Sequence, residues 1–274
     1  MTTSCEHFFT SNFPSPHTIR QDIEEHGFHV YREAIQKNVF AEIQDFWTQF
    51  FLSAPPCRNF VRGGLYLGEE NFNSFSRNHN WNLYRYFDFL WNEPTHELSQ
   101  KLAVAIHKKR NQAQGFDESY GLEYSPNCYG IYISVSHYPL DGGFFFPHTD
   151  GHSDIPLLHF MLPLTFKNKE YSEGGLVCYD KTGEKIDVDA QMSPGSIVFF
   201  DGRQRHAVEP IHQHSPTSAE SRLGRIALFA VPTIFQKNSK VPALLRDSKN
   251  SFFFGLEGIA LKARKTVNRA FNRS

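Results

Sequence analysis

Eight short runs of β-forming residues lie between Asn127 and Pro232, and turn residues separate each run from the next. Their bounds are Tyr129–Tyr138, Phe144–Thr149, Leu157–Thr165, Gly175–Tyr179, Glu184–Val188, Ser196–Phe200, His206–Ile211 and Arg225–Val231. Phe and Tyr, which favour strands, are abundant, with 27 and 11 copies in the chain. Short strands separated by turns are typical of a sandwich, a barrel or a jelly roll. The sequence therefore predicts a β unit in this part of the chain.

The first of these runs, with the sequence GIYISVSHYP, alternates between two kinds of side chain. Ile131, Ile133 and Val135 fall on one face, and polar side chains such as Ser134 and Tyr138 fall on the other. A polar face inside a small barrel is costly unless it lines a ligand cavity. We therefore expect a ligand site inside the β unit.

Residues from Thr18 to about Gly115 have mainly helical patterns. Asn38 is predicted to cap a helix, because the apolar residues that follow it recur at helical spacing. A second helix is predicted to open at Pro94 and Thr95. These two helices would support the β unit.

A long segment rich in Gly, Asn, Arg and aromatic residues separates the two helices. A loop of this length in a compact domain is usually functional, so residues 58–91 are predicted to form a lid. The arginines of this segment are Arg58, Arg62, Arg77 and Arg85. They could bind an anionic substrate, although arginines in a long loop are usually solvated.

After Pro232 the chain carries an apolar stripe from Leu256 to Phe271, flanked by basic residues. A basic amphipathic helix of this kind can contact a membrane surface, but most such helices pack on their own domain. No run approaches the roughly 20 apolar residues of a membrane span, and no secretory signal opens the chain. We therefore expect a cytoplasmic protein. The oligomeric state does not follow from the sequence.

The chain's formal net charge is -1, which gives no overall attraction to nucleic acid. Four cysteines, Cys5, Cys57, Cys128 and Cys178, are scattered without a CxxC spacing. They indicate reduced thiols rather than a disulfide framework or a zinc site.

The stretch PHTDGHSDIPLLHF, residues 147–160, holds several candidate metal ligands. Strand alternation places His148 and Asp150 on one face, where both can point at one ion. Gly151 breaks the strand, so His152 and Asp154 are expected in a loop at the mouth of the site, and His159 is expected to be structural. The third ligand is predicted to be His206. Two imidazoles and one carboxylate are the facial triad of non-haem Fe(II) oxygenases.

With these candidate ligands, the sequence resembles the Fe(II)/2-oxoglutarate-dependent oxygenases. The likeness covers roughly Asn127 to Val231, through the ordered pieces YPLDGGFFFPHTDG, EGGLVCYD, MSPGSIVFFDGRQRHAVEPI and GRIALFAV. His148, Asp150 and His206 match the family's H-x-D…H iron ligands. Arg225 matches its 2-oxoglutarate anchor, and Tyr138 resembles a tyrosine that supports the co-substrate. The insertion between His206 and Arg225 leaves Arg222 as an alternative anchor.

The resemblance implies a fold. The chain would be an α+β protein whose core is a double-stranded β-helix, the jelly-roll or cupin-like arrangement. One domain would span residues 1–274, with mainly helical support and a lid in 1–120, the jelly roll in 121–235 and a C-terminal helical extension in 236–274. The helical N-terminal part resembles, more loosely, that of phytanoyl-CoA-hydroxylase-type members.

The resemblance also implies an activity. The chain would be an iron and 2-oxoglutarate-dependent dioxygenase that uses O2 to oxidise a C–H bond of a small molecule, for example in specialised metabolism, releasing succinate and CO2. Asp150 favours hydroxylation over halogenation, because the halogenating branch has a small residue in its place. The alternatives are a peptide or protein hydroxylase of the same family, a nucleic-acid demethylase, and a non-enzymatic cupin-like metal-binding protein.

Overall fold

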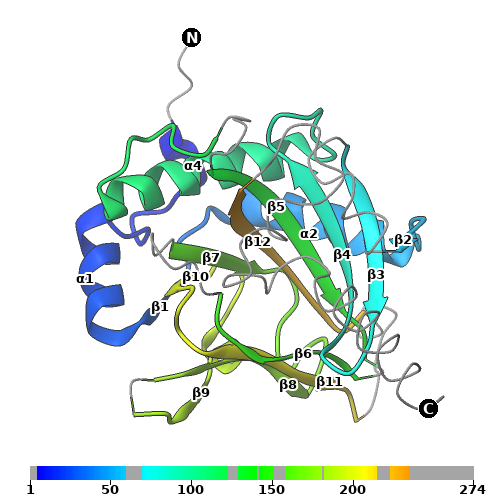
Figure 1. The fold of residues 1–274 in the computed structure, drawn as a ribbon. Helices are drawn as coiled ribbons and strands as arrows, with labels where there is room; N and C mark the ends of the chain where they lie inside the picture. Colours follow the sequence, from blue (N-terminus) through cyan, green and yellow to red (C-terminus); the bar gives the residue numbers. More distant parts are fainter. Residues whose placement is uncertain are drawn as a thin grey trace, which may run out of the picture.

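A computed structural model describes residues 5–59, 70–122, 129–140, 142–150, 158–180, 182–214 and 223–234 (Figure 1). The eight predicted strands are all present, each within three residues of its expected bounds. They are β5 (Tyr129–Tyr138), β6 (Gly143–His148), β7 (Leu158–Pro163), β8 (Glu173–Tyr179), β9 (Lys185–Asp187), β10 (Ile197–Asp201), β11 (His206–His212) and β12 (Arg225–Ile234). A 3-10 turn, η3 (Asp189–Gln191), follows β9.

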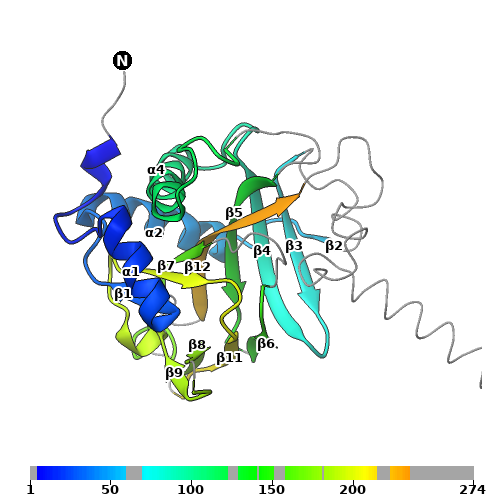
Figure 2. The same ribbon diagram turned by 60° about the vertical axis from the view of Figure 1, so that its left-hand side comes forward.

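The described residues form one 12-stranded sheet, in the order β1-β10-β7-β12-β5-β4-β6-β11-β8-β9. Here β1 is Phe28–Tyr31 and β4 is Trp81–Phe89; β3 (Phe72–Arg77) lies beside β4, and β2 (Arg58–Asn59) lies beside β3. The sheet curls on itself, so that β10, β7, β12 and β5 lie opposite β6, β11 and β8 (Figures 1 and 2). Strand pairing among the eight core strands is antiparallel. This is the double-stranded β-helix that the family resemblance implied.

Three helices lie on the outer side of one layer (Figure 2): α1 (Pro16–His26), α2 (Lys37–Leu52) and α4 (Glu97–Gln114). Ile43 of α2 and Leu102 of α4 share the main apolar core with Ile133 and Val135 of β5. Burying these side chains away from water stabilises the contact between the helices and the sheet. A short 3-10 turn, η1 (Cys5–Phe8), and the strand β1 (Phe28–Tyr31) complete this part.

The helix starts differ from the prediction. Gln36 is the N-cap of α2, because the Phe40 N–H already donates to the Gln36 carbonyl oxygen at 2.9 Å, so Asn38 lies inside the first turn. The second helix begins at Glu97 after an extended His96, three residues beyond Pro94.

The described second half of the predicted lid segment is not a loop. The strands β3 (Phe72–Arg77) and β4 (Trp81–Phe89) form a hairpin, and the two-residue strand β2 (Arg58–Asn59) pairs with β3. Strand β4 pairs with β5 through six residues, so the hairpin belongs to the sheet itself. The Gly and Asn residues in this segment are typical of loops, so the sequence did not predict these strands.

Strand β5 has the two faces that its sequence predicted. Ile133 and Val135 lie in the core beneath the helices, and Ser134, Ser136 and Tyr138 point to the inside of the curled sheet, where all three are buried. The predicted C-terminal helix, within 236–274, lies outside the described residues. Within the described part, no helix is long and apolar enough to cross a membrane.

Candidate metal centre

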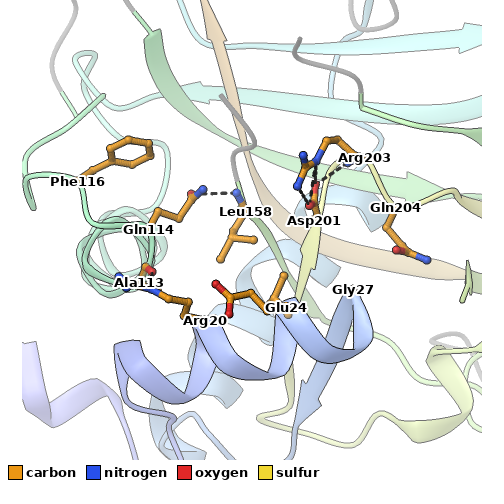
Figure 3. Close-up of a pocket in the computed structure, with 11 residues that line it drawn as sticks. Arg20, Glu24, Gly27, Ala113, Gln114, Phe116, Leu158, Asp201, Arg203 and Gln204 are labelled. Atoms are coloured by element: carbon orange, nitrogen blue, oxygen red, sulfur yellow. Dashed lines mark hydrogen bonds and ion pairs between the residues drawn. The ribbon is translucent and has the colours of Figure 1, made fainter. Parts of the chain in front are cut away.

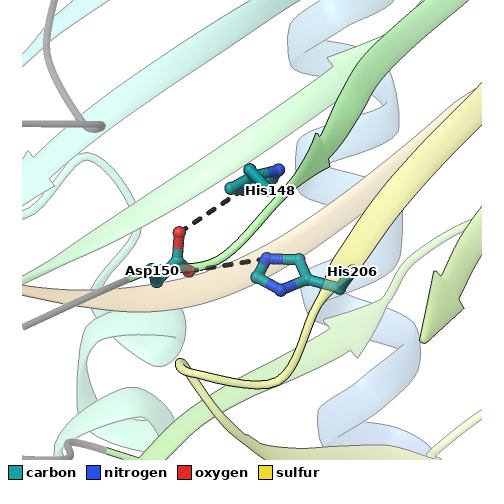
Figure 4. A group of neighbouring side chains, drawn as sticks. All are labelled: His148, Asp150 and His206. Carbon is teal, nitrogen blue, oxygen red and sulfur yellow. Dashed lines mark ion pairs between the residues drawn. The ribbon is translucent and has the colours of Figure 1, made fainter. Parts of the chain in front are cut away.

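His148, Asp150 and His206 converge inside the curled sheet (Figure 4). His148 ends β6 and His206 begins β11, and the two are direct partners in the register of these strands. The His148 Nε2 atom lies 3.4 Å from Asp150 Oδ1, and His206 Nε2 lies 3.5 Å from Asp150 Oδ2. Two ligand atoms that are each about 2.1 Å from one ion lie at most about 4.2 Å apart. The spacing therefore suits ligands of a single metal ion, and among the described residues these three form a group that could hold one.

Backbone contacts fix the orientation of each ligand. The Nδ1 atom of His148 lies 2.7 Å from the Phe146 carbonyl oxygen, and that of His206 lies 2.8 Å from the Gln204 carbonyl oxygen. Each Nδ1 therefore carries the hydrogen, which leaves the Nε2 lone pair for a metal. The Asp150 N–H donates to the Gly202 carbonyl oxygen at 2.6 Å, which holds the residue after the strand has ended.

The protonation of the site also suits a metal. Burial, together with the nearby His148, lowers the pKa of His206 to about 4. Burial on its own raises the pKa of Asp150, but the neighbouring His206 and His148 outweigh it and hold that pKa below its usual range. At neutral pH the site therefore offers a carboxylate at Asp150 and a neutral imidazole at His206, which are the forms that bind metal.

The triad opens onto a small cavity of about 60 Å³ between the two layers. The side chains around it are Arg85, Tyr138, Phe145, His148, Asp150, His159, Met161, Leu176, Phe200, His206, Val208, Arg225 and Phe229. A larger hollow of about 770 Å³ lies between α1, the end of α4 and the turn after β10 (Figure 3). Its charged side chains include Asp201 and Arg203, which pair with each other at 2.5 Å. The smaller cavity is therefore the candidate active site, because it contains the triad.

Arg225, the predicted anchor, lies in the same cavity as the triad. Asp189 holds it by two contacts, Nε to Oδ2 at 2.6 Å and Nη2 to Oδ1 at 3.1 Å. Burial on its own lowers the pKa of Arg225, but Asp189 outweighs it and raises that pKa, so the guanidinium is charged. Tyr138 lies against it, with the guanidinium carbon 5.5 Å from the ring centroid. The alternative anchor, Arg222, lies outside the described residues.

Sequence reasoning missed the surroundings of this arginine. Asp189 is buried and accepts further hydrogen bonds from the Tyr171 hydroxyl at 2.6 Å and the Leu176 N–H at 2.8 Å. No spacing in the sequence connects Asp189 with Arg225, because they lie 36 positions apart. The η3 turn brings them together.

His159, predicted to be a structural histidine, is buried against Phe200 and also lies close to the triad. Its Nδ1 atom lies 3.6 Å from Asp150 Oδ2, and its side chain lines the cavity. The register explains this position, because His159 faces Phe200 of β10 and stands two residues before Met161 on the inner face of β7. His152 and Asp154, predicted at the mouth, lie outside the described residues.

Two buried imidazoles and one buried carboxylate at one point, inside a jelly roll, are the donor set of the facial triad of non-haem Fe(II) oxygenases. Residues 133–230 match the family model described as "2OG-Fe(II) oxygenase superfamily". This segment, about a third of the chain, is therefore similar to the 2OG-Fe(II) oxygenases, which use iron and 2-oxoglutarate. The matched segment contains the whole triad, Tyr138, Asp189 and Arg225. A comparison with curated proteins found no match.

Solved structures with the same fold have low sequence identity. A prolyl-4-hydroxylase from Pseudomonas putida is 17% identical, with a TM-score of 0.51, 78% of this chain covered and 96% of that chain. A Trichoplax adhaerens prolyl hydroxylase, solved with a hypoxia-inducible-factor peptide, is 12% identical, with a TM-score of 0.51 and coverages of 78% and 87%. The epimerase SnoN from nogalamycin biosynthesis is 13% identical, with a TM-score of 0.50 and coverages of 84% and 87%. These likenesses confirm the fold.

Proposed function

We propose that the protein hydroxylates a C–H bond of a small-molecule substrate, with His148, Asp150 and His206 holding Fe(II) and Arg225 anchoring 2-oxoglutarate. The observation that carries the proposal is that the buried triad and the buried Arg225 line one cavity. When bound, iron would activate O2, which oxidises both 2-oxoglutarate, to succinate and CO2, and the substrate, to its hydroxylated product.

The chain's own residues would position the co-substrate. Arg225 keeps N–H groups on Nη1 for a carboxylate, because its contacts with Asp189 use Nε and Nη2. Tyr138, buried beside it, can donate its hydroxyl hydrogen to the same carboxylate. The apolar side chains around the cavity, such as Phe145 and Phe200, would exclude water from the reacting atoms.

A peptide substrate is the second candidate, since two proteins with the same fold are prolyl hydroxylases. We favour a small molecule because the resemblance of this chain to prolyl-hydroxylase-type members departs at the anchor. Those members usually have a lysine there, and this chain has Arg225.

The test begins with protein purified without metal and mixed anaerobically with Fe(II) and 2-oxoglutarate. A weak visible charge-transfer band is expected, followed by succinate release after air is admitted. Asp150→Ala should lose the band, whereas the matched control Asp45→Ala, an exposed aspartate on α2, should keep it. Failure of the folded wild-type protein to give band or succinate would refute the proposal. A mass-resolved panel of small molecules and proline-containing peptides, scored for one added oxygen, then identifies the substrate class.

A further inference from the structure

A second arginine, Arg85, lines the cavity beside the triad. It stands on β4, outside the segment 133–230 that matches the superfamily. Only 8% of the residue is exposed. Its Nε donates to the Ser136 Oγ atom at 3.3 Å. Arg85 is thus a buried cation in the site that the family match does not account for.

The surroundings of Arg85 are aromatic rather than acidic. Its guanidinium carbon lies 6.0, 5.8 and 5.6 Å from the ring centroids of Phe87, Phe145 and Phe229. Ring faces attract a cation but do not cancel its charge. Among the described residues, no carboxylate forms an ion pair with Arg85. A buried charge without a partner is costly, so the position of Arg85 suits an anionic ligand.

A comparison of Arg85 with Arg225 indicates which anion would bind beside Arg85. Asp189 already balances the charge of Arg225 through its two-point ion pair. Asp150 and the 2-oxo-acid carboxylate of 2-oxoglutarate together balance a divalent ion. The distal carboxylate of 2-oxoglutarate is then the one remaining negative charge, and Arg85 is the one remaining positive charge among the described groups around the cavity.

The register of the strands places the two arginines on one face. Arg85 is the partner of Ser136 on β5, and Arg225 is the partner of Tyr138 on the same strand. Ser136 and Tyr138 are two positions apart, so they point to the same side of the sheet. Arg85 and Arg225 therefore approach the inside of the sheet from either side of β5.

We propose that Arg85 is the charge partner of the distal carboxylate of 2-oxoglutarate, while Arg225, oriented by Asp189, supplies directional hydrogen bonds to it. This inference rests on the proposed function. A carboxylate of the substrate would be a poorer match, because together with 2-oxoglutarate it would leave one excess negative charge among the described groups in the cavity. The co-substrate site would thus be completed by a strand outside the family segment.

The test compares two 2-oxo acids of the same length. 2-Oxovalerate carries a methyl group in place of the distal carboxylate of 2-oxoglutarate, so both can chelate iron but only one presents the second charge. Each is titrated anaerobically into Fe(II)-loaded protein, and binding is followed by the charge-transfer band and by calorimetry. Arg85→Gln is expected to weaken 2-oxoglutarate at least about tenfold, as for loss of a charged hydrogen bond, and to leave 2-oxovalerate within about twofold.

Three further variants make the result specific. Arg77→Gln removes an exposed arginine from the neighbouring strand β3 and should bind both acids as the wild type does. Arg85→Lys keeps the charge and should retain most of the affinity for 2-oxoglutarate. Ser136→Ala removes only the hydrogen bond that holds Arg85, and should weaken 2-oxoglutarate by a few-fold. This mild change tests the same contact even if Arg85→Gln fails to fold.

Equal 2-oxoglutarate affinity in wild type, Arg85→Gln and Ser136→Ala would overturn the inference, as would an equal loss for both acids. Failure of the proposed function gives a different result, since the wild-type protein would then show no band with either acid.

Discussion

Asp189 and Arg225 form a two-point ion pair beside the cavity, with Nε and Nη2 of the arginine 2.6 and 3.1 Å from the two carboxylate oxygens. Both side chains are buried, with 2% of Asp189 and 4% of Arg225 exposed to solvent. The pair connects the η3 turn to the first residue of β12. It orients the guanidinium and also sets the charge that a ligand in the cavity meets.

Replacement of Asp189 by Asn is expected to destabilise the protein by about 3–5 kcal/mol, because Arg225 would be left as a buried charge without a partner. Urea denaturation measures this loss. The control is Glu209→Gln, which breaks the exposed pair between Lys185 and Glu209, whose distance is 2.8 Å. That change should cost no more than about 1 kcal/mol. Similar losses for the two variants would show that Asp189 is not the sole charge partner of Arg225.

Gly175 leaves room for Asp189. The backbone φ of Gly175 is +106°, and a Cβ atom there would lie 2.5 Å from Asp189 Oδ2. Gly175→Ala therefore combines backbone strain with a clash against the ion pair. Gly183 also has a positive φ, +87°, but a Cβ atom there would meet nothing within 4 Å. Gly183→Ala is thus a matched control for the strain alone, with a cost of about 1–2 kcal/mol.

Thermal melting of the two glycine variants separates the contributions. Gly175→Ala should melt at a clearly lower temperature than Gly183→Ala, and should also bind 2-oxoglutarate more weakly because Asp189 has moved. If the two variants melt together, the packing of Asp189 against Gly175 contributes nothing to stability.

The β runs of the core and the pairing of His148 with Asp150 could be predicted because both depend on local patterns, whereas the resemblance to a family implied the double-stranded β-helix and supported His206. Alternation along β5, and the H-x-D spacing of His148 and Asp150, are properties of neighbouring residues. The rest depends on contacts between distant segments. Asp189 reaches Arg225 only through the η3 turn, and Arg85 enters the cavity only because β4 pairs with β5. Nothing in the sequence around Arg85 distinguishes it from the exposed Arg77.

Asp88 is expected to make the free energy of unfolding depend on pH. It is fully buried on β4, where Asn71 Nδ2 donates to it at 2.9 Å. Burial raises its pKa to about 7 from an ordinary value of 3.8. The folded state therefore binds more protons than the unfolded state between these values, so this group's contribution to stability falls as pH rises from about 4 to about 7. The loss is on the order of 4 kcal/mol.

Asp88→Asn should remove this loss. Denaturation of wild type and variant at several pH values gives the difference in their free energies of unfolding, and this difference should shift in favour of the variant as pH rises from 4 to 7. The comparison cancels the contribution of His137, whose pKa burial lowers to about 4 and which acts with the opposite sign. A difference that does not change with pH would show that Asp88 is not protonated in the folded protein at acidic pH.

Metal binding should stabilise the folded protein through His206 and not through His212, although both residues lie on β11. His206 begins the strand inside the cavity, and His212 ends it exposed to solvent. A ligand at 100 times its dissociation constant stabilises a folded protein by about 2.7 kcal/mol, so added Fe(II), or Mn(II) in air, should raise the melting temperature of the wild type and of His212→Ala. A chelator should reverse the rise. His206→Ala should show no rise, because two ligands of the triad hold a divalent ion much more weakly than three. An equal rise in both variants would place the metal elsewhere in the chain.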